Sequence, residues 1–139
     1  MLLLALAVLL AVPNVVFADG DGPACSDHTL RGSYLFSATG FGPTPSGTPL
    51  QPKAIVESIV FNGDGTLTVT KATVSFAGQI LTFPGGTGTY DLGEQCTGVL
   101  TFSNGLTFDI YADPNGDLVK MIQTNPGNVL QGNVSRVSR

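Results

Sequence analysis

Tryptophan is absent from the 139 residues of this chain, and histidine occurs only once. Charged side chains make up 12% of the residues, well below the usual quarter. The six lysines and arginines are scattered, and ten acidic residues bring the formal net charge to −4. Nucleic-acid binding needs clustered basic residues, so this composition excludes that class of partner. The hydrophobic share of 42% is too high for a disordered chain and predicts a compact, acidic domain.

Residues that carry metal or nucleophilic chemistry are equally scarce. His28 is the single histidine, which excludes a histidine-based metal site and leaves only a carboxylate site open. It follows Ser26 and Asp27 directly, a spacing that seldom gives a working catalytic triad. Residues 113–117 begin like a calcium loop, but Leu118 replaces the required glycine. We therefore predict no metal site and no cofactor.

The apolar run at residues 2–12 is too short to cross a membrane as a helix. Such a run makes a helix of about 16 Å, against a bilayer core of about 30 Å. Its length is typical of a signal peptide, and small or β-branched residues at 16 and 18 suit cleavage after Ala18. No lysine or arginine precedes the run, as one usually does in a signal peptide, and an uncleaved membrane anchor is the alternative. We predict a signal peptide at 1–18, one domain at 19–139, a secreted or periplasmic location and no membrane span in the mature chain.

Two cysteines, Cys25 and Cys96, stand far apart and form no C-x-x-C motif. Neither a redox motif nor a zinc site is therefore supported. A signal peptide indicates an oxidising compartment, where such a pair forms a disulfide; two free thiols are the alternative. A bridge closing a loop of about 70 residues stabilises a fold by roughly 4 kcal/mol in the chain-entropy model. We predict a disulfide between Cys25 and Cys96.

After residue 25 no stretch keeps a helical period, and apolar residues alternate with polar ones between turn signals. Turns such as Asn62-Gly63-Asp64-Gly65 contain residues that tolerate positive φ. The pattern predicts an all-β fold, a single antiparallel up-and-down barrel of about eight strands, with a β-sandwich as the alternative. A break at residues 84–86 raises the count to nine if it separates two strands. The predicted strands are 31–40, 54–62, 65–77, 79–83 continuing to 87–92, 96–103, 106–112, 117–124 and 129–137.

Strand alternation also predicts which side chains point into the barrel. The pattern switches near Lys71, where Leu67 and Val69 give way to Val74 as apolar positions, so we expect a change of register there. The one long connection, Gly40–Lys53, holds four prolines and three glycines. A connection of this length is either a lid over the barrel mouth or a surface excursion.

Glu57 is the most informative residue of the predicted interior, because it lies between two inward isoleucines. A buried carboxylate is costly unless it is paired or protonated, which makes Glu57 a candidate acid, base or ligand anchor with a raised pKa. The alternatives are that the strand faces are reversed here or that Glu57 lies at a solvated rim. Tyr34, Tyr90 and Gln123 are the predicted polar partners in the same barrel, unless they are ordinary core side chains.

Five short motifs occur in a fixed order along the chain: LRGSY at 30–34, FNGDG at 61–65, GTY at 88–90, CTGVL at 96–100 and IQTNPG at 122–127. Together they resemble an uncharacterised family of small secreted, mostly bacterial β proteins. The inferred architecture is also similar to the barrels of allene oxide cyclases and dirigent proteins, a likeness of topology that implies no function. This chain departs from the family at Glu57, where the resemblance implies glycine or another small residue, so it implies no shared catalytic role.

Three functions fit this sequence. The first is a secreted, disulfide-pinned barrel that binds a small, mainly apolar ligand in its lumen. The second is a cofactor-free cyclase or isomerase acting in the cavity, with Glu57 or a tyrosine moving a proton. The third is a structural surface or matrix protein with a filled barrel, which a cavity of a few hundred Å³ would argue against. The sequence leaves enzyme activity and oligomeric state open. The predicted ligand contacts are Tyr34, Phe36, Glu57, Phe61, Tyr90, Phe102, Phe108, Met121 and Gln123.

Overall fold

The structure, a computed structural model, describes residues 22, 24–46 and 49–139. The predicted signal peptide at 1–18 lies outside the described residues. Residues 79–92 form two strands, because Gly85, with φ of 148°, interrupts them. The elements are η1 (Asp27–Thr29), β1 (Arg31–Gly42), β2 (Gln51–Asn62), β3 (Thr66–Phe76), β4 (Gln79–Phe83), β5 (Gly86–Leu92), β6 (Thr97–Phe102), β7 (Thr107–Ala112), β8 (Leu118–Gln123) and β9 (Val129–Ser138).

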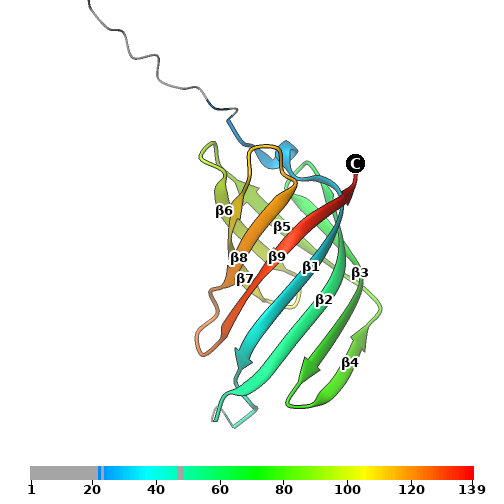
Figure 1. Cartoon of the computed structure of the whole chain (residues 1–139), viewed down its shortest axis with the longest axis vertical. Helices are drawn as coiled ribbons and strands as arrows, with labels where there is room; N and C mark the ends of the chain where they lie inside the picture. The colour runs from blue at the N-terminus through cyan, green and yellow to red at the C-terminus, as the bar shows by residue number, and fades with distance from the viewer. Residues whose placement is uncertain (1–21, 23, 47–48) are drawn as a thin grey trace, which may run out of the picture.

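Eight of these strands close an antiparallel barrel (Figure 1). Each barrel strand pairs with the next barrel strand along the chain. β4 is not one of them, so β3 pairs with β5, and β1 pairs with β9 to close the barrel. The prediction of an up-and-down barrel is therefore confirmed. β4 is an extra strand that pairs with β3 beyond the part of β3 that pairs with β5, and within the described part of the chain β3 is its one partner. None of the described helices is long and apolar enough to span a membrane.

A register shift in the β2–β3 ladder confirms the predicted change near Lys71. Ser58 pairs with Lys71, whereas the next residue of β2, Ile59, pairs with Val69. At this point β3 therefore has one residue more than β2, which makes a β-bulge. A bulge bends its strand and moves the side chains beyond it to the opposite face of the sheet. Ala72 consequently points inward beside Glu57, with which it pairs.

β3 divides its second edge between two partners. Residues 66–69 pair with β5, whereas residues 72–76 pair with β4. Past Val69, β3 therefore parts from β5, and the barrel wall opens on that side. The connection between β1 and β2 is shorter than the predicted Gly40–Lys53, because β1 continues to Gly42 and β2 begins at Gln51.

The end of the barrel that contains the start of β1 and the end of β9 is filled with aromatic rings. Tyr34, Phe61 and Tyr90 are at most 5% exposed, and Phe61 contacts both tyrosines edge to face with ring centroids 5.0 Å apart. Edge-to-face contacts of this kind are favourable beyond the apolar area that they bury. Further along the lumen Phe108 contacts Phe36 and Phe102 at 6.0 and 5.8 Å. Side chains thus fill this half of the interior.

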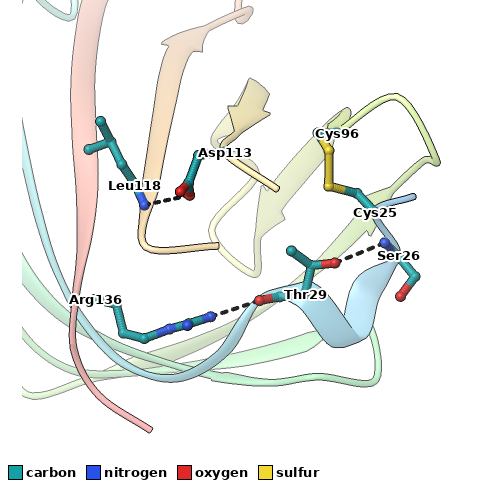
Figure 2. Close-up of a disulfide and its surroundings, with 7 residues drawn as sticks. All are labelled: Cys25, Ser26, Thr29, Cys96, Asp113, Leu118 and Arg136. Carbon is teal, nitrogen blue, oxygen red and sulfur yellow. Dashed lines mark hydrogen bonds between the residues drawn. A yellow bond between two sulfur atoms is a disulfide. The ribbon is translucent and has the colours of Figure 1, made fainter. Parts of the chain in front are cut away.

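The segment before β1 closes this filled end (Figure 2). Cys25 and Cys96 form the predicted disulfide, with their Cα atoms 5.0 Å apart. Leu30 is fully buried, and the side chain of Asp27 accepts a hydrogen bond from the Leu92 amide at 2.8 Å. His28 is exposed in η1. We call this end of the molecule the closed end.

Candidate functional site

A pocket of about 520 Å³ lies at the other end of the barrel, where β3 parts from β5. Its volume falls within the range of about 300–1,000 Å³ that is usual for small-molecule sites. Turn residues at the rim contribute polar groups, including Ser103, Asn104 and Asn128. The walls are mainly apolar and come from β2, β3, β4 and β6, with the side chains of Ile55, Val69, Ala72, Val74, Leu81 and Phe102.

One wall of the pocket is the hairpin formed by β3 and β4. Alternation along β4 turns Leu81 and Phe83 toward the pocket and Ile80 away from it. Leu81 and Phe83 are still 46% and 47% exposed, because β4 has β3 as its one described neighbour. Large apolar side chains that remain exposed beside a cavity are typical of ligand-binding grooves.

Glu57 projects from β2 into this pocket. Its cross-strand neighbours are Phe36 on β1 and Ala72 on β3, neither of which offers a side-chain donor. The carboxyl oxygen Oε2 is buried and has no hydrogen-bond partner. Burial raises the pKa of Glu57 to about 7, and the positive charge of Lys53 partly opposes that rise. Glu57 can therefore gain or lose a proton near neutral pH.

Lys53 is the second ionisable residue of the pocket wall and lies four residues before Glu57 in β2. Burial lowers the pKa of Lys53, and the Glu57 carboxylate works in the opposite direction. Among the described side chains the one ion pair within 4.0 Å joins Arg136 and Asp117, so Lys53 acts on Glu57 without direct contact. Residues four apart in a strand point to the same face, so alternation predicts that Lys53 and Glu57 share a face. Lys53 was nevertheless absent from the site residues predicted from the sequence.

The structure separates the nine predicted ligand contacts into two groups. Glu57 and Phe102 line the pocket. The other seven are buried in the packed interior and do not line it, and their role as ligand contacts stays a prediction. They are Tyr34, Phe36, Phe61, Tyr90, Phe108, Met121 and Gln123.

The prediction that Tyr34 or Tyr90 holds the Glu57 carboxyl group is wrong. The Tyr34 hydroxyl donates to the carbonyl of Gly116 at 2.7 Å. The Tyr90 hydroxyl lies 2.8 and 2.9 Å from the carbonyls of Asp27 and Leu30. Both tyrosines point to the closed end, because backbone carbonyls there need donors. Burial raises the pKa of Tyr90 to about 12, which also disfavours proton transfer by this group at neutral pH.

Gln123 is not a partner of Glu57 either. Its side-chain amide nitrogen donates to Oδ1 of Asn125 at 3.0 Å, and its buried oxygen Oε1 has no partner. The side chain is 5% exposed and lies outside the pocket lining. Gln123 therefore belongs to the packed interior near the β8–β9 turn.

No model of a known protein family matches this chain, and a search of curated proteins gives no match. The pocket offers an apolar volume, an acid that titrates near neutral pH and a half-buried lysine in its wall. This arrangement suits the binding of an apolar molecule that carries one polar group.

Proposed function

We propose that this protein is a disulfide-pinned β-barrel that binds a small, mainly apolar molecule in the pocket at the end of the barrel opposite the closed end. The observation that carries the proposal is the pocket of about 520 Å³ with mainly apolar walls, in a barrel whose other half is filled. An eight-stranded barrel has room for side chains or for one small ligand. A purely structural barrel would fill both halves, so the open half favours binding over the structural alternative.

The disulfide supports export as part of the same proposal. Cys25 and Cys96 are joined across 71 positions, and no free cysteine occurs among the described residues. Disulfides persist in oxidising compartments such as the periplasm or the cell exterior. A protein that operates there fits the proposed signal peptide and the proposed resemblance to small secreted β proteins.

Fluorescence of the uncharged probe Prodan tests the binding proposal. Its emission should shift to the blue and saturate at one molecule per chain, because the pocket removes the probe from water. Val74→Trp should abolish the shift, since Val74 lines the pocket. Val56→Trp is the matched control, because Val56 is 58% exposed on the outer face of β2 and should leave binding unchanged. Equal binding by both variants, or no saturable binding by the wild type, would contradict the proposal.

A second candidate function, a cofactor-free cyclase or isomerase, is favoured by one observation. A general acid or base works best when its pKa lies near the working pH, and the pKa of Glu57 is about 7. In this alternative the pocket folds a polyene-like substrate and Glu57 moves the proton. Glu57→Gln should then abolish turnover with little loss of substrate binding. A variant that keeps its turnover would eliminate this candidate and leave the binding function intact.

A further inference from the structure

The unpartnered carboxyl oxygen of Glu57 restricts which apolar molecules the pocket can bind well. Oε2 is buried, and the side chains on the neighbouring strands, Phe36 and Ala72, offer it no donor. Glu57 also lines the pocket, so a ligand that fills the pocket covers the rest of this carboxyl group as well. A buried acceptor without a donor destabilises a complex, and more so when the acceptor is charged. The best ligand is therefore one that itself supplies the donor.

Charge narrows the ligand class further. Within the described lining of the pocket, Glu57 and Lys53 are the two charged side chains. A carboxylate ligand would meet the negative charge of Glu57, and a hydrocarbon would leave Oε2 unpaired. An ammonium group provides both N–H donors and a compensating positive charge, and hydrogen bonds between charged partners are about twice as strong as neutral ones.

We infer that the pocket selects a small apolar amine, bound with its ammonium group against the carboxylate of Glu57 and its apolar part against the walls. This inference rests on the proposed binding function and adds the chemical class of the ligand. The apolar part would contact Ile55, Ala72 and Phe102, and beyond them the exposed face of Leu81 and Phe83. Burying those two side chains adds hydrophobic stabilisation in proportion to the apolar area removed from water.

Lys53 opposes a cationic ligand only weakly. It does not contact Glu57 within 4.0 Å, and water and salt screen its charge only where its half-buried side chain reaches solvent. Its repulsion should nevertheless be measurable. Lys53→Gln should raise the affinity for an amine severalfold and lower the affinity for a carboxylate. These opposite changes would show that the positive charge of Lys53 acts on the bound ligand.

Isothermal titration calorimetry with three probes of equal chain length, n-octylamine, n-octanol and n-octanoate, tests the inference at pH 8. Octylamine should bind at least about tenfold more tightly than octanol, the factor expected for a charged hydrogen bond of about 1.5 kcal/mol. Glu57→Gln should remove this preference and change octanol binding less than about threefold, because the amide keeps the shape and an acceptor oxygen. Octanoate should bind most weakly.

Proton release provides an independent measurement. Glu57 has a pKa of about 7, so at pH 6 it must lose a proton before it pairs with an ammonium group. An alkylammonium, like lysine, keeps its own proton at this pH. Octylamine affinity should therefore rise about tenfold from pH 6 to pH 8, with protons released to the buffer at pH 6, whereas octanol affinity should stay flat.

Each outcome separates the inference from the proposed function. If octanol and octylamine bind equally well and both displace Prodan, the binding function stands and the amine selectivity is wrong. If octanoate binds most tightly and Lys53→Gln weakens it, the charged anchor is Lys53 and the amine inference is overturned. If none of the three probes binds and Prodan does not bind either, the proposed function itself fails.

Discussion

Arg136 donates a hydrogen bond from Nε to the hydroxyl of Tyr34 at 2.9 Å, and the same hydroxyl donates to the carbonyl of Gly116 at 2.7 Å. The guanidinium group also donates to the carbonyl of Thr29 at 2.8 Å and pairs with Asp117 at 3.0 Å (Figure 2 shows the contact with Thr29). One buried side chain near the C-terminus thus joins β9 to β1, to the segment before β1 and to the turn between β7 and β8. Tyr34 therefore has a structural role at the closed end.

Tyr34→Phe should lower the free energy of unfolding by about 1–3 kcal/mol, because the carbonyl of Gly116 and the Arg136 guanidinium lose a buried partner. Prodan binding should be unchanged, since Tyr34 lies at the end of the barrel opposite the pocket. Urea unfolding measures the first effect and fluorescence the second. Tyr111→Phe is the matched control, because Tyr111 is 54% exposed on the outer face. A loss of Prodan binding in Tyr34→Phe alone would return Tyr34 to the ligand site.

The disulfide joins the segment before β1 to the turn that leads into β6. Replacing Cys25 and Cys96 together by serine should lower the free energy of unfolding by roughly 4 kcal/mol, because the 71-residue loop of the unfolded chain is no longer constrained. Urea unfolding of the oxidised wild type, the reduced wild type and the double variant checks this. The last two should agree with each other. A double variant as stable as the oxidised wild type would contradict the prediction.

The alternation of apolar side chains, together with the short turns between strands, predicted the barrel and placed Glu57 in its interior. Side chains on successive residues of a strand point to opposite faces, so Glu57 was placed inside with its neighbours Ile55 and Ile59. The register change near Lys71 was predictable for the same reason, since the apolar positions move from Val69 to Ala72 and Val74. These features depend on short stretches of sequence.

The position of the pocket was not predictable from the same pattern. Tyr34 and Gly116 are 82 residues apart, and only the closed barrel brings the hydroxyl to the carbonyl. Alternation assigns Tyr34 to the interior, but it does not say which end of the lumen is plugged. Likewise, the residues of β4 form a recognisable strand, yet only the way in which β3 divides its edge between β4 and β5 leaves β4 with a single neighbour among the described strands.

One residue of the β3–β4 turn, Ala77, has a backbone conformation that is unfavourable for alanine and that a substitution should relieve. Ala77 has φ of 50° and Gly78 has φ of 79°, the pair of positive values that a tight hairpin turn requires. Alanine adopts this region at a cost of roughly 1 kcal/mol, whereas asparagine tolerates it better. Ala77→Asn should therefore stabilise the hairpin by about 0.5–1 kcal/mol, and Gly78→Ala should destabilise it. Hydrogen exchange of the β4 amides measures this locally, and slower exchange in Gly78→Ala would contradict the argument.

Glu57 should make the stability of the protein depend on pH. Its pKa rises from an ordinary value of 4.5 to about 7 on folding, mainly because of burial. The folded state thus binds the proton more tightly than the unfolded state does. The resulting stabilisation is fully present below pH 4.5 and is lost as the pH rises through about 7.

Between pH 5 and pH 8 the free energy of unfolding of the wild type should fall by about 2–3 kcal/mol relative to Glu57→Gln, because one pKa unit corresponds to about 1.4 kcal/mol. Glu57→Gln cannot titrate, so it should be the more stable protein at pH 8. Taking the difference between the two proteins at each pH cancels the titration of all other groups. Glu94→Gln, the same change at an exposed position, should follow the wild type throughout. If the difference between wild type and Glu57→Gln is constant across this range, Glu57 is solvated in the folded protein and can be neither a buried anchor nor a poised acid.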